Sequence, residues 1–529
     1  MMRILELVLS LLVAVAGLTL FGRRLPVPLP IIQVIGGLLL GLIPGMPQVR
    51  LAPDLVFLIF LPLLIYPAAL FTSWRDFQAN LRPILLLAVG LVLFTTVVIG
   101  FLAHWLIPDF SLAAGLVLGA IISPPDAIAA TAITQRLRVP QRIVTVLDGE
   151  SLVNDATALV AYRFAAAAVL TGSLSWGKVV GNFFLVGVGG IAIGLVVGYV
   201  FAAIQKRIND PPIEITLSLL TPFAAYLPAE QLGVSGVLAV VVAGLHHGWH
   251  APEFMTARTR LQAGPVWHMI EFLLNGFIFV LIGLQLPQVL HGLGARPVGQ
   301  LVSYALIMSL AAILVRIAWV FPATYLPRLL FKGIRARDPY PSWRHVTVVA
   351  WTGMRGVVSL AAALALPLTT EAGAQFPGRD LILFLTFVMI LSTLVVQGLS
   401  LPLIIKGLKV TGDNVAQQEE ITARLKANQA ALARIDEIAK SDGMPQKIID
   451  RIRDEYEDRI RELESAQESS EANSKGLFPA EYEQVSREAL KVERNTILNL
   501  RNEWVINDEV MRRIQRDIDL AEARLRETD

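Results

Sequence analysis

Residues 147–164 read LDGESLVNDATALVAYRF and lie in an apolar run long enough for a membrane-spanning helix. The stretch nevertheless carries three carboxylates and an amide within eight positions. On a helix, residues four apart share a face, so Ser151 and Asp155 form one stripe and Glu150 and Asn154 form the next. Hydroxyl, amide and carboxylate oxygens are hard ligands that suit a small alkali cation. The stretch therefore predicts a polar, cation-binding face on an apolar helix.

Composition divides the chain into two regions. It has 529 residues, 54% of them hydrophobic, and no cysteine, which excludes disulfides and thiolate metal sites. The first 410 residues hold 26 Lys and Arg against 16 Asp and Glu, whereas the last 119 hold 19 against 27. We predict a transmembrane domain over residues 1–409 and an acidic, helical, cytoplasmic domain over residues 410–529.

About thirteen apolar runs approach the ~20 residues that a helix needs to cross ~30 Å of hydrocarbon. They predict an all-α, multi-pass membrane protein. Their approximate limits are 4–21, 26–43, 55–71, 83–107, 110–132, 145–170, 177–203, 212–229, 233–247, 266–288, 298–326, 346–368 and 380–405.

Basic residues in the loops indicate the orientation. If the N-terminus lies outside and each run crosses the membrane, the inside loops hold 16 Lys and Arg and the outside segments hold five. The five outside residues are Arg3, Arg50, Lys178, Arg296 and Arg379. Because basic residues concentrate on the cytoplasmic side, this asymmetry predicts a protein of the cell membrane whose N-terminus lies outside and whose C-terminal tail lies in the cytoplasm.

Three charged residues are predicted near the middle of the bilayer: Asp126, Asp155 and Arg355. At 1.5 Å per residue, Asp155 and Arg355 lie about 15 Å inside their helices. A charge at that depth costs at least ~2.5–3.5 kcal/mol and usually marks an ion or proton path. A buried ion pair that only locks helices together is the structural alternative. Two acids against one base leave a carboxylate without a static partner, which favours ion transport.

Two of the runs are predicted to be broken helices. Pro124 and Pro125 remove backbone donors just before Asp126, and two glycines flank Arg355. Non-helical backbone at this depth is tolerated only inside protein or along an aqueous cavity. Paired broken helices in two halves of a chain indicate an inverted-repeat transporter whose binding site lies at the membrane midplane.

Three motifs resemble the monovalent cation:proton antiporter-1 family, the sodium/proton exchangers. They are SPPDAIAATAI at 123–133, LDGESLVNDATALV at 147–160 and RGVVSLAAALALP at 355–367. The resemblance covers the membrane region and implies the two-domain antiporter fold, with core and dimerisation subdomains and crossed broken helices. It implies a homodimer that exchanges Na⁺, Li⁺ or sometimes K⁺ for H⁺.

The resemblance also implies roles at the ion site. Asp155 matches the carboxylate that binds either the cation or the proton, and Asn154 and Ser151 match its additional ligands. Pro125 and Asp126 fall in a motif that is commonly Pro-Thr-Asp, so that Pro125 offers only a carbonyl oxygen there. A single acid of this kind implies electroneutral exchange.

Further residues are expected to stabilise the core. The resemblance implies that Arg355 pairs with Glu150. It also indicates that Pro67 stands about where relatives often carry an acid. Glu271 and Arg316 lie in spans, and we expect them to form structural pairs between helices, or to line the dimer side, rather than to contact the ion.

Other function classes fit less well. An ion channel needs a continuous pore, whereas a binding carboxylate between broken helices suits alternating access. An enzyme is not expected, because the sequence has no G-x-S-x-G elbow, Walker loop or H-E-x-x-H zinc motif; the one His-x-x-x-His spacing, His246 and His250, lacks the Glu of that motif. A K⁺-selective antiporter, or one for another solute on the same fold, is the main alternative. Membrane lipid is the expected surrounding, and no cofactor or nucleic acid is expected.

Overall fold

The computed structural model describes most of the chain as helix. The described residues are 2–22, 24–25, 27–43, 56–108, 110–171, 176–293, 297–370, 373–410, 412, 415–440, 445–469, 480–503, 511, 514–515 and 517–521. Within them the β-structure consists of one isolated bridge, between Thr369 and Gln375. The chain divides into two compact units, Met1–Gly412 and Asp413–Asp529.

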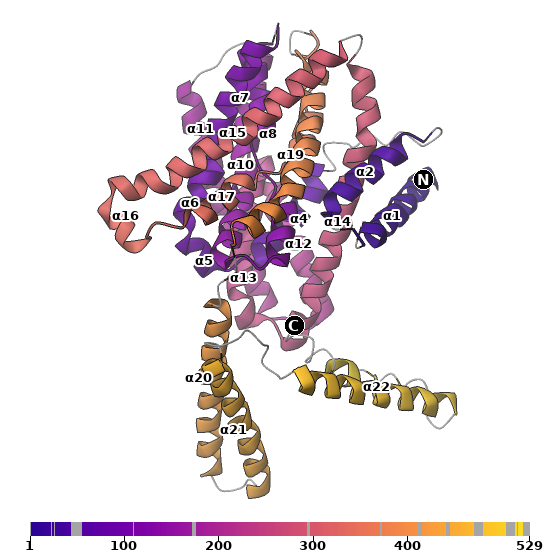
Figure 1. Cartoon of the computed structure of the whole chain (residues 1–529), viewed down its shortest axis with the longest axis vertical. Coiled ribbons are helices and arrows are strands. Elements are labelled where there is room, and N and C mark those ends of the chain that lie inside the picture. Colours follow the sequence, from indigo (N-terminus) through magenta and orange to yellow (C-terminus); the bar gives the residue numbers. More distant parts are fainter. Residues whose placement is uncertain are drawn as a thin grey trace. The chain divides into compact units, whose positions relative to one another are not determined.

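The first unit holds the apolar helices (Figure 1). They are α1 (Met2–Gly22), α2 (Leu29–Gly41), η1 (Val56–Phe60), α4 (Leu61–Leu70), α5 (Trp74–Ala79), α6 (Leu81–Leu85), η2 (Leu86–Leu91), α7 (Val92–Leu106), α8 (Leu112–Ile122), α9 (Ala127–Arg136), α10 (Gln141–Thr171), α11 (Trp176–Gln205), α12 (Pro211–Gln231), α13 (Gly236–Phe254), α14 (Ala257–Gly292), α15 (Val298–Leu330), α16 (Lys332–Arg337), α17 (Trp343–Trp351), α18 (Val357–Leu364) and α19 (Arg379–Gly407).

Each predicted apolar run coincides with one of these helices or with a consecutive group of them. By length and composition, seven helical segments in the described residues are able to cross a membrane, and three shorter apolar helices accompany them. The number of true crossings therefore stays a prediction. The two runs predicted to be broken are broken, since α8 ends before α9 begins at Ala127 and α17 ends before α18 begins at Val357.

Helix packing separates two groups within the first unit. In one group α8 packs against α7, α10, α18 and α19, and α15 packs against α7, α17 and α19. In the other, α2 packs against α14, and α13 packs against α4, α11 and α12. The helices α4 and α14 also contact the first group, through α10 and α19 respectively. The first group contains both broken helices.

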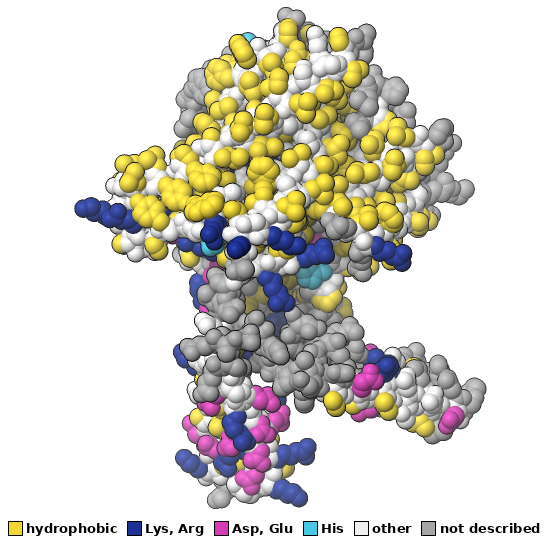
Figure 2. Space-filling model, in the orientation of Figure 1, with side chains coloured by type: hydrophobic (Ala, Val, Ile, Leu, Met, Phe, Trp, Pro, Cys, Tyr) yellow, Lys and Arg dark blue, Asp and Glu magenta, His cyan; other side chains and the backbone are white. Residues whose placement is uncertain are grey.

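The surface of the first unit is that of a membrane protein. Figure 2 shows an almost continuous apolar face with Lys and Arg side chains gathered along one edge. Large apolar side chains such as Trp105 and Val13 are 82% and 73% exposed. Because such a surface is unfavourable in water, hydrocarbon is its natural surrounding.

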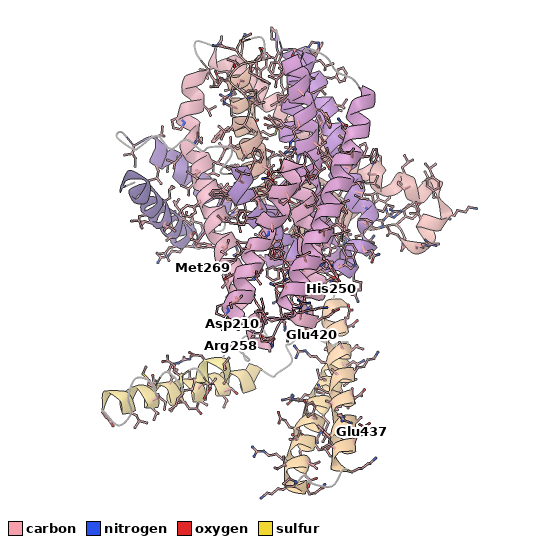
Figure 3. All side chains as sticks on the ribbon, turned by 180° about the vertical axis from the view of Figure 1, so that it is seen from behind. Asp210, His250, Arg258, Met269, Glu420 and Glu437 are labelled. Carbon is pink, nitrogen blue, oxygen red and sulfur yellow. The ribbon has the colours of Figure 1, made fainter. Side chains whose placement is uncertain are left out.

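Several loops predicted to lie on one side of the membrane lie together. Asp210, which caps α12, His250 near the end of α13 and Arg258 at the start of α14 are at the same end of the first unit (Figure 3). Of the residues used to orient the chain, Arg23, Arg50 and Arg296 lie outside the described residues. Which end faces the cytoplasm stays a prediction.

The second unit contains α20 (Val415–Ala439), α21 (Gln446–Ser469) and α22 (Ala480–Asn502). Helices α20 and α21 pack together, and Arg453 pairs with Asp436 across them at 2.7 Å. The division after Gly412 lies within a few residues of the predicted boundary.

Candidate functional site

The two broken helices meet at their breaks. The backbone N–H of Asp126, between α8 and α9, donates to the carbonyl of Met354, between α17 and α18, at 2.7 Å. The contact is possible because Gly356 has no side chain: a Cβ there would lie 1.7 Å from Oδ2 of Asp126. The local cause of the break is Pro124–Pro125 in one segment and glycine in the other. Two extended segments therefore cross beside the long helix α10.

Charged side chains offset the partial charges of the helix ends that the breaks create. Asp126 caps α9, its Oδ1 accepting from the N–H of Ile128 at 2.9 Å, and it also lies against Gly356 at the start of α18. The Arg355 guanidinium donates through Nε to the carbonyl of Ile122, the last residue of α8, at 3.0 Å. Acids at helix N-termini and bases at C-termini are stabilising.

The predicted pairing of Arg355 with Glu150 is wrong. Glu150 instead pairs with Arg316 of α15, whose Nη1 and Nη2 lie 2.6 and 2.8 Å from its two oxygens. Arg316 also donates to the carbonyl of Val349 near the end of α17. Both partners are 1% exposed. Arg316 therefore forms the structural pair between helices that the sequence predicted for it, but with a partner that the sequence assigned elsewhere.

Asn154 and Ser151 connect α10 to the first break. The Asn154 amide donates to the Pro125 carbonyl at 2.7 Å, and the N–H of Ala127 donates to Ser151 Oγ at 3.4 Å. The Pro125 carbonyl, expected to serve as a cation ligand, is thus already bonded to Asn154. The buried Asn154 Oδ1 has no hydrogen-bond partner among the described residues. An amide oxygen without a hydrogen-bond partner, beside the helix break, is available as a ligand for a cation.

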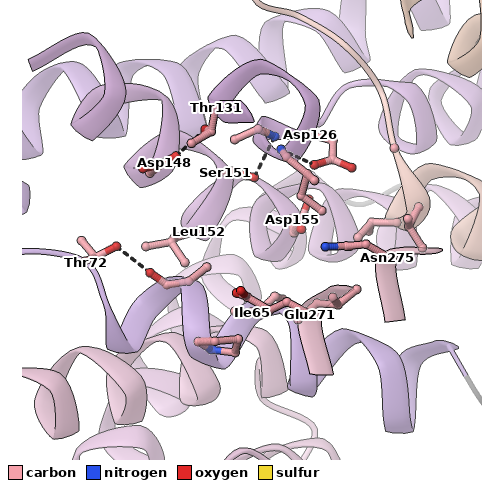
Figure 4. A pocket seen from close by; sticks show the side chains of 18 of the residues that line it. Ile65, Thr72, Asp126, Thr131, Asp148, Ser151, Leu152, Asp155, Glu271 and Asn275 are labelled. Atoms are coloured by element: carbon pink, nitrogen blue, oxygen red, sulfur yellow. Dashed lines mark hydrogen bonds between the residues drawn. The ribbon is translucent and has the colours of Figure 1, made fainter. Parts of the chain in front are cut away.

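Asp155 lies on the wall of a cavity of about 560 Å³ (Figure 4). Asp126, Ser151 and Asp148 line the same cavity, and Thr131 donates to Asp148 at 2.6 Å. No Lys or Arg in the described part of the chain forms an ion pair with Asp155. Its carboxylate therefore faces the cavity without a fixed counter-charge, unlike Glu150, whose charge is matched.

The facing wall carries polar residues that the sequence did not place there. Glu271 and Asn275 of α14 line the cavity across from Asp155 (Figure 4). Pro67 of α4 is also part of the cavity lining. The expected pair between helices is wrong for Glu271, because the ionisable side chain beside it is His268 on the same helix, 3.4 Å away. Pro67 leaves its position in the wall without a carboxylate.

Comparison with known proteins identifies the family. A family model described as "Sodium/hydrogen exchanger, transmembrane" matches residues 8–407. The chain belongs to this family. A protein of Mycobacterium tuberculosis described as an uncharacterized Na⁺/H⁺ exchanger is 37% identical over 525 residues, which cover 98% of this chain and 96% of the relative. The family predicted from the three motifs is therefore confirmed, and with it the prediction of a multi-pass cation/proton antiporter.

Two further matches concern activity and fold. A protein of Bacillus pumilus described as a sodium, potassium, lithium and rubidium/H⁺ antiporter is 37% identical, over 76% of this chain and 61% of its own length. The solved structure of the sodium proton antiporter MjNhaP1 from Methanocaldococcus jannaschii has a TM-score of 0.61 at 19% identity and covers 76% of this chain and 99% of its own. The predicted antiporter fold is confirmed.

Proposed function

We propose that this chain exchanges a monovalent cation, with Na⁺ as the main candidate and Li⁺ and K⁺ as alternatives, for H⁺ at Asp155. The single observation that carries the proposal is that Asp155 lines a membrane cavity and has no basic partner in the described residues. An unmatched carboxylate at this depth is costly unless it binds a cation or a proton. Since one carboxylate holds one or the other, competition couples the two fluxes.

The neighbours of Asp155 supply oxygen ligands and a rigid frame. Ser151 Oγ and the free Oδ1 of Asn154 provide uncharged oxygen ligands for the cation. Asp126 and Ser151 line the same cavity as Asp155. Hard cations of the alkali group bind carboxylate, amide and hydroxyl oxygens of this kind. The buried Glu150–Arg316 pair fixes α10 against α15, and Asp155, five residues further along α10, takes no part in that pair.

The cavity reaches one end of the bundle. From Asp155 it extends to Thr72, Gln135 and Gln141, at or just beyond helix ends next to loops predicted to face the cytoplasm. This arrangement suits the inward-open state of an alternating-access cycle. Exchange of one cation for one proton at one acid is electroneutral. The homodimer implied by the resemblance is proposed as well, and light scattering in detergent tests it.

Dissipation of a pH gradient in proteoliposomes tests the proposed function. Adding Na⁺, Li⁺ or K⁺ should dissipate the pH gradient in proteoliposomes with the wild type and leave the gradient unchanged in those with Asp155→Asn. The matched control, Glu253→Gln, changes a carboxylate that is 57% exposed, away from the cavity, and should exchange normally. Full exchange by Asp155→Asn would contradict the proposal. A rate that changes severalfold when the membrane potential is clamped would contradict electroneutrality alone.

A further inference from the structure

A second cavity lies beside the first group of helices and has no role in the proposed exchange. Its volume is about 330 Å³, within the ~300–1,000 Å³ typical of small-molecule sites. Apolar side chains of η2, α10, α15 and α17 form its interior, and Arg82, Arg142 and Arg328 line it together with His345. The interior residues are Leu86, Leu87, Ile143, Val146, Val320, Ala323, Val346 and Val349. An apolar interior with a basic border is the complement of an anionic amphiphile.

The three arginines share one acid. Asp338 lies 2.6 Å from Nη2 of Arg82, 2.7 Å from Nη2 of Arg142 and 2.6 Å from Nη2 of Arg328. The cluster therefore carries two positive charges in excess. Asp338 lies in the connection between α16 and α17, so the ion cluster joins that connection to α6, α10 and α15.

Two of the arginines keep donors that the protein does not use. Each of the three guanidinium nitrogens of Arg328 already donates to the protein, because Nε and Nη1 also donate to the carbonyls of Asp338 and Thr324. Arg142 uses Nε for Asn80 and Nη2 for Asp338, and Arg82 uses only Nη2. Within the described residues, Nε and Nη1 of Arg82 and Nη1 of Arg142 have no protein partner. Their side chains are 30% and 46% exposed, so these donors are accessible to an anion.

The position of the cavity selects a lipid as its occupant. All three arginines lie near helix ends. The loops that follow or precede these ends belong to the side of the membrane that holds most of the basic residues. Leu81 and Leu85 of α6 are 39% and 42% exposed, as lipid-facing side chains are. Tyr340 and Trp343, which precede and begin α17, are 44% and 57% exposed, and such aromatic residues typically lie at headgroup depth.

We propose that this cavity binds one anionic phospholipid, its phosphate on Arg82 and Arg142 and part of one acyl chain in the apolar interior. Planar guanidinium groups hold phosphate through paired N–H donors, and basic residues at the membrane surface attract anionic lipid. The start of α10, next to Arg142, adds the positive end of a helix dipole to the same place. Val349, on the cavity wall, also accepts from Arg316, so the lipid would lie next to the Glu150–Arg316 pair.

Native mass spectrometry of the full chain tests this proposal. After purification in detergent, the protein is mixed with phosphatidylglycerol or phosphatidylcholine, and the fraction that retains one lipid is measured. Phosphatidylglycerol should be retained preferentially. Arg82→Gln/Arg142→Gln should weaken its binding roughly fivefold for each arginine removed, which is the factor that a basic residue contributes near an anionic membrane surface. Arg328 is left in place so that Asp338 keeps a partner.

Matched variants separate the parts of the site. Arg335→Gln/Arg337→Gln removes the same charge from exposed positions on α16 and should bind phosphatidylglycerol as the wild type does. Ala323→Phe fills the cavity, leaves the ion cluster intact and should also lose the lipid, which keeps the test decisive if the arginine variant does not fold. Three outcomes would each overturn the proposal. The first is that phosphatidylcholine is retained as well as phosphatidylglycerol, and the second is that inorganic phosphate protects against thermal unfolding as well as phosphatidylglycerol does. The third is that Ala323→Phe binds phosphatidylglycerol as tightly as the wild type.

Discussion

Arg316 and Glu150 form a two-point ion pair that is almost entirely removed from solvent, with N–O distances of 2.6 and 2.8 Å. Breaking such a pair from one side leaves a buried charge without compensation, at a cost of ~3–5 kcal/mol. We therefore predict that Glu150→Gln lowers the stability of the protein by about that amount. The thermal unfolding midpoint in detergent, compared with that of the wild type, measures the loss.

An exposed ion pair provides the control. Arg163 and Glu230 are also 2.6 Å apart, but their side chains are 46% and 25% exposed. Since exposed pairs contribute ~0–1 kcal/mol, Glu230→Gln should change the midpoint little. If the unfolding midpoint fell equally in the two variants, the buried Glu150 pair would contribute no more to stability than the exposed pair. The double variant Glu150→Gln/Arg316→Met should recover part of the loss, because it removes both buried charges.

The close approach of Asp126 to Gly356 makes a second prediction. A methyl group at position 356 would have to displace the Asp126 carboxylate from the start of α18. Gly356→Ala should therefore cost ~1–3 kcal/mol, as overpacking does, and should slow cation-driven proton flux. Gly299→Ala is the control, because nothing lies within 4 Å of its added Cβ. Wild-type flux and stability in Gly356→Ala would show that the crossing is not tightly packed.

Much of the fold could be predicted because its causes are local. Hydrocarbon thickness sets the length of the apolar runs, and Pro124–Pro125 and the glycines beside Arg355 break helices wherever they occur. The same local reasoning placed Asp126 and Arg355 at the breaks, and the structure has both beside the ends of the half-helices. The second region was evident from its charge alone.

Contacts between distant segments could not be predicted in the same way. Glu150 and Arg316 are 166 residues apart, and α15 has 33 residues where about 20 suffice to cross the membrane. Depth along so long a helix cannot be counted from its first apolar residue, so nothing in the sequence opposed the partner that the family resemblance implied for Glu150, which was Arg355. Glu271 was misplaced for a related reason, since the polar and apolar residues of α14 do not separate onto two faces and its sequence does not show which side faces the cavity.

Glu271 offers a third prediction, on cation affinity. Its carboxylate lines the cavity opposite Asp155, where it attracts an entering cation without blocking the proton. Glu271→Gln should raise the KM for Na⁺ roughly fivefold, equivalent to ~1 kcal/mol of attraction in a hydrated site, and leave kcat nearly unchanged. Met269→Gln on the same helix is the control, because Met269 is 64% exposed. An unchanged KM in Glu271→Gln would remove this residue from the cation path.

Asp338 supports a prediction about pH. Burial raises the pKa of its carboxyl, but hydrogen bonds and charge from Arg142 and Arg328 outweigh that effect and hold the pKa below its usual value of 3.8. A lowered pKa in the folded state means that the ionised group stabilises the fold at pH values above its unfolded pKa, and that this contribution is lost as the pH falls through the folded pKa. Asp338→Asn should therefore destabilise the protein at pH 7.

The difference between Asp338→Asn and the wild type should shrink below about pH 4 and vanish at lower pH, because the wild-type carboxyl is then protonated as well. Thermal unfolding midpoints of the two proteins between pH 7 and pH 3 measure this convergence. Asp380→Asn is the control, since that side chain is 55% exposed and lies 3.8 Å from one arginine instead of within 2.7 Å of three. It should follow the wild type throughout. A gap for Asp338→Asn that persists unchanged at pH 3 would mean that lost packing, and not lost charge, destabilises the variant.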